Sequence, residues 1–306
     1  MKQTFSVSQN EGGQRIDVWL SKALGISRKQ VKAKLDSGLV SLNGKKVRIA
    51  KWALKAGDRV AVRAPNPGAG GKRGGFVNIL MDDRHVMVVE KPSGILSVAA
   101  PGEPEAGSML DRVREYIKRK HKVKHAFVSG LHRLDVETSG VMVFAVSKDG
   151  ERVRRQFADH TIVRRYFAVV DGQVEKEQGV IKGSIEKGKF TGGRKARVIA
   201  DNESISEIAK DARTDYRVVE RYENATLLDV MLHTGRTHQI RVHLASIGHP
   251  VVGDRTYGSK TKFPRQALHA YILGFRHPVG RNKIEFKSAL PNDMQKLIDR
   301  LRGIND

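Results

Sequence analysis

A segment rich in glycine and proline divides this chain into two parts of unequal length. Residues 65–75 have the sequence Pro-Asn-Pro-Gly-Ala-Gly-Gly-Lys-Arg-Gly-Gly, which contains no large apolar side chain. Segments of this composition are flexible and cannot build a core. The sequence therefore predicts a linker at residues 65–76. It separates a first domain at residues 1–64, with its core in residues 15–63, from a second domain at residues 77–306.

The charge of the chain indicates its partner. It carries 56 Lys and Arg against 33 Asp and Glu, a formal net charge of +23, and residues 1–76 alone hold 16 basic and 4 acidic side chains. Such an excess favours a polyanion, because phosphate contacts release condensed counterions. An anionic membrane is the alternative, but the sequence has no convincing basic amphipathic helix and no apolar run of transmembrane length. We therefore expect a nucleic acid and no membrane.

Several classes of site are disfavoured by what the sequence lacks. There is no cysteine, which excludes disulfides and thiolate metal sites. There is no phosphate-binding loop and no dinucleotide-binding glycine pattern. The three histidines at positions 233, 238 and 243 lack the spacing of a metal motif. Residues 1–10 have no apolar run typical of a secretory signal. We expect no cofactor, no metal and a cytoplasmic protein.

The first domain has the pattern of a small α/β module. Apolar residues recur at helical spacing over residues 16–24, and a second helix is predicted from a capping box of Ser27 and Gln30 to a stop at Gly38. An Asn-Gly pair at residues 43–44 predicts a hairpin. The second helix carries basic residues on its outer face, which either contact nucleic acid or are merely solvated: Arg28, Lys29, Lys32 and Lys34.

The second domain contains an unusual turn at residues 132–140, His-Arg-Leu-Asp-Val-Glu-Thr-Ser-Gly, followed by the apolar run of residues 141–146. The turn residues favour a tight loop, and the run predicts a buried strand. The carboxylate of Asp135 is therefore held at a rigid strand end, where it can be aimed at a substrate. The alternative is structural, with Asp135 capping the turn and Arg133 pairing with it on the surface.

Other segments surround this turn with further strands, helices and one loop. Strands are predicted at residues 86–89, 163–172, 214–222 and 226–232, and helices at residues 108–120 and 153–158 and in the segment before Gly248. The Gly-, Lys- and Arg-rich residues 183–197 predict a mobile loop that contacts nucleic acid. The second domain is thus predicted to be of mixed α and β composition.

The turn matches residue for residue the signature His-Arg-Leu-Asp-x-x-Thr-Ser-Gly of RNA pseudouridine synthases of the large-ribosomal-subunit type, and the first domain resembles the S4 RNA-binding domain. The resemblance implies an α+β protein: an S4-like module, then a catalytic domain with a mixed, largely antiparallel sheet. It also implies that uridine in RNA is isomerised to pseudouridine. In that role Asp135 either attacks C1′ of the ribose as a nucleophile or removes the 2′ proton as a base, and the sequence does not decide between these two reactions.

The resemblance also implies further roles at matching positions. Tyr166 stacks on the target base and its hydroxyl moves the C5 proton, unless it is an ordinary strand aromatic. Arg241 pairs with Asp135, and on this basis we expect Arg241→Met to remove turnover and leave the fold intact. Arg133 fills the gap left by the flipped base or holds a phosphate. Two further residues have equally weighted alternatives: Leu268 packs on the base or in the core, and Lys91 contacts phosphate or solvent.

The chain departs from the family at Val136 and Glu137, where a basic residue is common, which puts local phosphate contacts in doubt. The preferred substrate is ribosomal RNA of the large subunit, naked or in an assembly particle, with transfer RNA as the alternative. Two other classes remain open. One is a non-catalytic RNA-binding assembly factor, and the other is a glycosidase, which needs a second carboxylate near Asp135. We expect a monomer.

Overall fold

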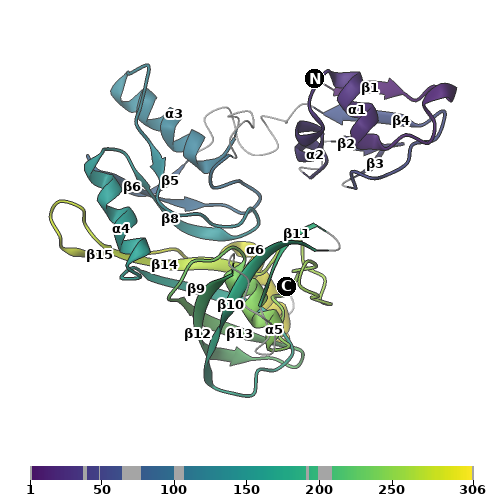
Figure 1. Cartoon of the computed structure of the whole chain (residues 1–306). Helices are drawn as coiled ribbons and strands as arrows, with labels where there is room; N and C mark the ends of the chain where they lie inside the picture. The colour runs from purple at the N-terminus through teal and green to yellow at the C-terminus, as the bar shows by residue number, and fades with distance from the viewer. Residues whose placement is uncertain are drawn as a thin grey trace. The chain divides into compact units, whose positions relative to one another are not determined.

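The computed structural model describes residues 2–36, 40–47, 49–63, 77–99, 107–190, 193–198 and 209–304. The chain forms two compact units, Met1–Phe76 and Val77–Asp306, each with its own core (Figure 1). The predicted linker, residues 65–76, and the predicted helix stop, Gly38, lie outside the described residues. No helix in the described part of the chain is long and apolar enough to cross a membrane.

The first unit packs two helices on a small antiparallel sheet. Strands β1 (Lys2–Ser6), β4 (Arg59–Arg63), β2 (Val40–Leu42) and β3 (Lys45–Lys46) form the sheet in that order. Helices α1 (Ile16–Leu24) and α2 (Arg28–Asp36) bury the predicted apolar faces against it, with Ile16, Leu20, Val31 and Leu35 fully buried. A short 3₁₀ helix, Gln9–Glu11, precedes α1. Strand β1 was not predicted, because its pairing with β4 is a long-range contact.

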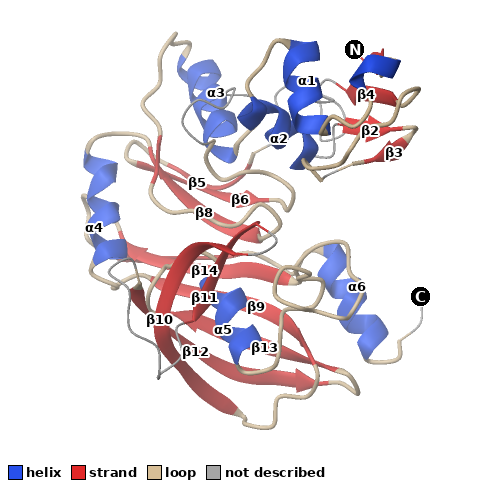
Figure 2. Ribbon diagram, turned by 45° about the vertical axis from the view of Figure 1, so that its right-hand side comes forward, coloured by secondary structure: helices blue, strands red, loops and turns tan. Residues whose placement is uncertain are grey.

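The second unit is built on one large, mixed sheet (Figure 2). Its strands are β5 (Asn78–Asp82), β6 (Val86–Lys91), β7 (Ser129–Gly130), β8 (Ser139–Ala145), β9 (Val163–Asp171), β10 (Gln178–Phe190), β11 (Gly193–Val198), β12 (Lys210–Arg221), β13 (Ala225–Leu232), β14 (Leu268–Arg276) and β15 (Lys283–Lys287). They follow the order β11-β10-β12-β13-β9-β14-β8-β6-β5, and β15 pairs with β14 and β7 with β8. Among the described strands only β14 and β8 run parallel. This confirms a mixed, largely antiparallel sheet in an α+β protein.

The helices of this unit cover both faces of the central strands. They are α3 (Met109–His121), α4 (Val153–Ala158), preceded by a 3₁₀ turn (Asp149–Arg152), α5 (Gln239–Ser246) and α6 (Asn292–Leu301). Strand β8 is buried along its whole length because alternate residues enter two different cores. Met142 and Phe144 pack with α3 and α6, whereas Val141 and Val143 pack with α4. The uninterrupted apolar run in the sequence therefore reflects burial on both faces.

One predicted loop is wrong. Residues 183–197, expected to form a mobile loop, lie largely in the hairpin of β10 and β11, and β10 also pairs with β12. Apolar side chains at Ile185 and Ala196 pack on Ala212 and on Val242 of α5. Tertiary packing here overrides the low strand preference of a Gly- and Lys-rich segment.

Candidate active site

The Asp135 loop is held from several sides. It connects β7 to β8, and its own turn is closed by Thr138 N–H donating to the Asp135 carbonyl at 3.1 Å. Ser97 is buried and bonds Leu134 twice, accepting from its N–H at 2.9 Å and donating to its carbonyl at 2.7 Å. Gln266 donates to the Thr138 hydroxyl at 2.9 Å. These bonds fix the backbone on both sides of the carboxylate.

Lys91 is a second anchor of this loop. Its side chain is buried, and its ammonium donates to the carbonyls of Pro92, Ile95 and Val136 at 2.8–3.0 Å. Burial lowers the pKa of Lys91 to about 7, although the charge of Asp135 acts in the opposite direction. The expectation of a phosphate contact or a surface lysine is therefore corrected. All three donors of the ammonium are used on backbone carbonyls, and one of these belongs to the residue after Asp135.

Arg241 lies between two carboxylates. Its Nη1 donates to Asp135 Oδ2 at 3.0 Å, and its Nε and Nη2 grip both oxygens of Asp254 at 2.5 and 2.9 Å. Side-chain exposure is 7% for Arg241, 1% for Asp254 and 22% for Asp135. Burial acts to lower the pKa of Arg241, but the bonds and charges of Asp254 and Asp135 together raise it. A permanent positive charge is thus held beside a partly open carboxylate.

His238 and Tyr257 complete the surroundings of Asp135. His238 Nε2 lies 3.9 Å from Asp135 Oδ1, and its Nδ1 is 3.1 Å from the Tyr257 hydroxyl. The Tyr257 ring lies under the Arg241 guanidinium, 5.1 Å from the ring centre, and its oxygen accepts from Ala196 N–H at 3.0 Å. Burial lowers the pKa of His238 and outweighs the opposing charge of Asp135. The imidazole is therefore neutral near pH 7.

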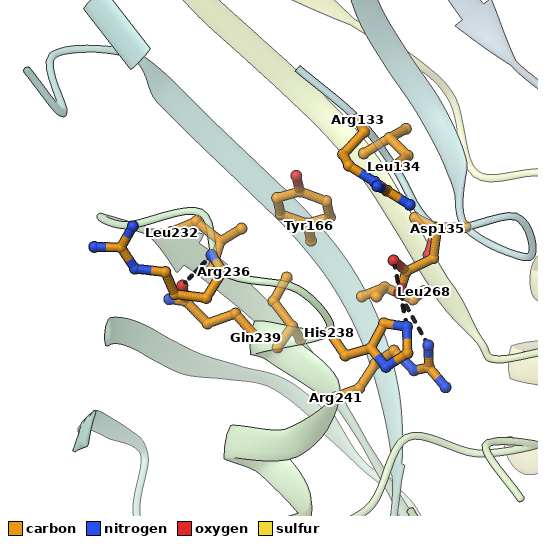
Figure 3. A pocket seen from close by; sticks show the side chains of 12 residues that line it. Arg133, Leu134, Asp135, Tyr166, Leu232, Arg236, His238, Gln239, Arg241 and Leu268 are labelled. Atoms are coloured by element: carbon orange, nitrogen blue, oxygen red, sulfur yellow. Dashed lines mark hydrogen bonds and ion pairs between the residues drawn. The ribbon is translucent and has the colours of Figure 1, made fainter. Parts of the chain in front are cut away.

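A pocket opens in front of these side chains (Figure 3). Tyr166, on β9, presents its ring there with 6% of the residue exposed, and burial raises the pKa of its hydroxyl. Leu268, at the start of β14, is 3% exposed and also reaches the pocket. Arg133 also lines the pocket, and its side chain is exposed to solvent. Asp135 is the one carboxylate among the described residues that line it: Arg133, Leu134, Asp135, Thr138, Tyr166, Leu232, Arg236, His238, Gln239, Ile240, Arg241 and Leu268.

The first unit holds three residues that were predicted to contact RNA, and all three belong to helix α2. Arg28 and Lys32 are exposed on α2, and Lys29 belongs to the same helix. Arg28 also donates to the buried Asp17 at 2.9 Å while its side chain stays 56% exposed. Part of this basic helix is therefore open to a ligand, and Arg28 also serves the fold.

The three histidines that suggest a metal have separate partners. His233 bonds Asp215 at 2.8 Å, and His243 is fully buried and bonds the Thr214 hydroxyl at 2.9 Å. His238 turns toward Asp135 instead. No group of three or more potential ligand side chains gathers in the part of the chain that the structure describes.

Sequence reasoning missed Asp254, His238 and Tyr257 as members of the site. His238 was weighed only as a metal ligand. Asp254 follows a Pro-Val-Val-Gly segment, and Tyr257 lies in the turn that begins at Asp254. The local sequence of both residues is therefore typical of an ordinary turn and does not indicate a site. The positive φ of Gly253, +79°, marks this turn but does not identify a site.

Comparison with known proteins gives a family match in each of the two units. Residues 85–246 match the family model for RNA pseudouridylate synthase, and residues 14–60 match that of the S4 domain. An uncharacterized RNA pseudouridine synthase of Bacillus subtilis is 34% identical over 97% of both chains. A protein of Zymomonas mobilis named ribosomal large subunit pseudouridine synthase D is 33% identical over 94% of both chains.

A solved structure is similar over the same region. Human RNA pseudouridylate synthase domain containing 4 has 25% sequence identity and a TM-score of 0.61, and the match covers 74% of this chain and 93% of that chain. The S4 module and the catalytic domain both indicate RNA as the partner. The site geometry, the family matches and the near full-length relatives lead to one conclusion: this chain belongs to the RNA pseudouridine synthase family and is an RNA pseudouridine synthase that carries an S4 domain.

Proposed function

We propose that this enzyme isomerises specific uridines in large-subunit ribosomal RNA, with Asp135 as the group that acts at the ribose. The observation that carries the proposal is the arrangement of Asp135. Its Oδ2 accepts from the buried Arg241, and its other oxygen faces the pocket beside His238. A carboxylate so held has a fixed orientation and lies beside a permanent positive charge.

The proposed chemistry follows from this arrangement. The target uridine leaves its stack, as bases do in other base-modifying enzymes, and enters the pocket. Asp135 attacks C1′ or removes the 2′ proton, and the bond between C1′ and N1 breaks. The uracil turns so that C5 bonds to C1′, and in this step the ester to Asp135 breaks or the proton taken from the ribose returns to C2′. The C5 proton then leaves and N1 takes up a proton, so that the net reaction is an isomerisation. Tyr166, whose raised pKa keeps its hydroxyl neutral, stacks on the uracil and passes this proton on.

Binding roles follow for the side chains around the pocket. Leu268 packs against the uracil across from Tyr166, since both line the pocket. Arg133 is exposed and able to enter the space left by the flipped nucleotide or to hold a phosphate. On the S4 module, Arg28, Lys29 and Lys32 contact RNA phosphates. Lys91 is given no RNA contact, because its ammonium donates to three backbone carbonyls.

The glycosidase alternative is disfavoured because no second carboxylate is among the described residues that line the pocket. Asp254 is linked to Asp135 through Arg241, but it is 1% exposed, does not line the pocket and has both oxygens bonded. It therefore has no route to activate a water molecule, as a second catalytic carboxylate must. A non-catalytic assembly factor would have no need of a carboxylate that is paired with a buried arginine and faces a pocket.

The choice of ribosomal RNA rests on the relatives and on the S4 module. The Zymomonas mobilis relative is named as a large-subunit enzyme, and so is one of Nitrosomonas europaea at 32% identity. We extend this substrate, and with it a cytoplasmic location, to the present chain. Transfer RNA remains the competing substrate for the same chemistry.

The deciding experiment is chemical mapping of pseudouridine in unmodified large-subunit RNA after incubation with the wild-type protein or with Asp135→Asn. New pseudouridine with wild type and none with the variant is expected. A parallel incubation with transfer RNA identifies the substrate class. If Asp135→Asn produced pseudouridine at the wild-type rate, the proposed role of Asp135 would be wrong. If wild type modified neither RNA nor an assembly particle, the assembly-factor alternative would replace the proposal.

A further inference from the structure

His238 has an unusual backbone position in the pocket, and the proposed chemistry gives its ring no task. The residue directly precedes α5 with φ +56°, in the left-handed region that non-glycine residues rarely adopt. Gln239 holds this conformation. Its side-chain oxygen accepts from Arg236 N–H at 2.9 Å, and its amide donates to the Arg213 carbonyl at 3.0 Å. A strained conformation that its surroundings hold in place is a reason to look for a function.

The hydrogen-bond network sets which ring nitrogen of His238 carries the proton. The Tyr257 oxygen already accepts from Ala196 N–H at 3.0 Å, so its own proton is free to be donated to His238 Nδ1 at 3.1 Å. In a neutral imidazole the remaining proton then resides on Nε2. The charged groups around the ring are Asp135, Arg241, Asp254 and Arg133. Nε2 faces Asp135, the nearest anion, which favours an N–H there.

The distance between Nε2 and Asp135 leaves room for one more atom. At 3.9 Å the two groups are too far apart for a direct hydrogen bond. An oxygen placed about 2.9 Å from each fits between them. It must accept from His238 Nε2–H and donate to Asp135 Oδ1, since Oδ2 is taken by Arg241. A hydroxyl group has both capacities, whereas a carbonyl or phosphate oxygen cannot donate.

We propose that His238 and Asp135 together bind the 2′-hydroxyl of the target uridine, so that this pair selects ribose over deoxyribose. The inference rests on the proposed action of Asp135 at C1′, because the 2′-hydroxyl is borne by the neighbouring carbon. It also assigns a function to Tyr257, which is a positioning residue that fixes the tautomer of His238. The 2′-hydroxyl is the group by which a protein distinguishes RNA from DNA at one nucleotide.

The test compares two synthetic RNAs that span the mapped site and carry uridine or 2′-deoxyuridine at the target. Their dissociation constants are measured with the full-length Asp135→Asn variant, which prevents turnover. This variant also removes the carboxylate that accepts from the 2′-hydroxyl, so the ratio of the two constants reports on the hydrogen bond from His238 Nε2–H. Loss of one hydrogen bond is expected to weaken binding of the deoxy RNA about two- to tenfold. Adding His238→Ala is expected to lower this ratio by about the same two- to tenfold factor. Effects of the deoxy sugar on RNA conformation are common to both proteins and cancel.

Two further variants keep the test decisive. His238→Gln retains an N–H donor and is expected to keep part of the ratio. Tyr257→Phe leaves His238 in place without its proton donor and is expected to reduce the ratio, whereas a purely structural role would weaken both RNAs equally. An unchanged ratio in His238→Ala, or a ratio of 1 with His238 present, overturns the inference. Absence of pseudouridine with wild type is a separate result that overturns the proposed function instead.

Discussion

The buried ion pair of Arg241 and Asp254 makes a quantitative prediction about folding. Both side chains are at most 7% exposed and share two hydrogen bonds. Removing one member of such a pair leaves a buried charge without its partner, which typically costs about 3–5 kcal/mol. We expect Arg241→Met and Asp254→Asn each to lower the free energy of unfolding of the catalytic unit by about 3 kcal/mol. This value lies at the lower limit because the remaining side chain keeps one partner: Arg241 keeps Asp135, and Asp254 keeps the N–H of Thr256.

The double variant provides the control. With both charges absent, no buried ion is left unpaired, so its loss of stability is expected to be smaller than the sum of the single losses by about 2 kcal/mol. Asp135→Asn is expected to cost less than about 1 kcal/mol, because Asp135 is 22% exposed and Arg241 keeps its stronger partner. All variants lacking Arg241 or Asp135 are expected to lose most turnover.

The assay can separate the two units. Both tryptophans of the chain, Trp19 and Trp52, lie in the N-terminal unit, so tryptophan fluorescence in urea reports on that unit and serves as an internal control. Far-UV circular dichroism follows the large sheet of the catalytic unit. A catalytic unit as stable in Arg241→Met as in wild type, or strictly additive losses in the double variant, would refute the reasoning. The first result would also restore the sequence-based expectation of an intact fold.

Three other predictions follow from single residues. Gly140→Ala is expected to destabilise the catalytic unit by about 3 kcal/mol or more, measured in urea, because φ is +126° and a Cβ would lie 2.1 Å from the Ala270 carbonyl oxygen. Burial lowers the pKa of His243 from 6.5 to about 4. The unfolded state therefore takes up the proton first, and stability present above pH 6.5 is lost between pH 6.5 and 4; His243→Asn is expected to flatten this decline in urea titrations. Lys32→Ala is expected to weaken RNA binding and to reduce by about 1 the slope of log K against log salt; an unchanged slope would remove Lys32 from the interface.

The Asp135 loop and its strand could be predicted because their determinants are local. Turn residues followed by a continuous apolar run require a tight loop and a strand buried on both faces, whatever the rest of the chain does. Helix α3 was predicted within one residue at each end, because Ser108 caps it and its apolar residues recur on one face. The resemblance of the turn to the pseudouridine synthases then supplied the reaction.

The surroundings of Lys91 and of residues 183–197 could not be predicted in the same way. A lysine before a proline has the same local sequence whether its ammonium reaches solvent or three carbonyls, and only packing decides which. The Gly- and Lys-rich segment has a weak strand preference, which is outweighed once β12 offers hydrogen bonds and α5 offers an apolar surface.

The sequence by itself determined the two-domain division, the basic RNA-binding character, the tight turn that carries Asp135 and the family. These features are set by composition and by residues adjacent in the chain. Only the tertiary structure decided that Arg241 is shared by two carboxylates and that His238 lies between the Tyr257 hydroxyl, at 3.1 Å, and Asp135, at 3.9 Å. The physical reason is that burial and hydrogen-bond partners depend on side chains from different elements of the fold. Arg241 and Asp254 are 13 residues apart, whereas Asp135 and Arg241 are 106 residues apart and meet only in the folded chain.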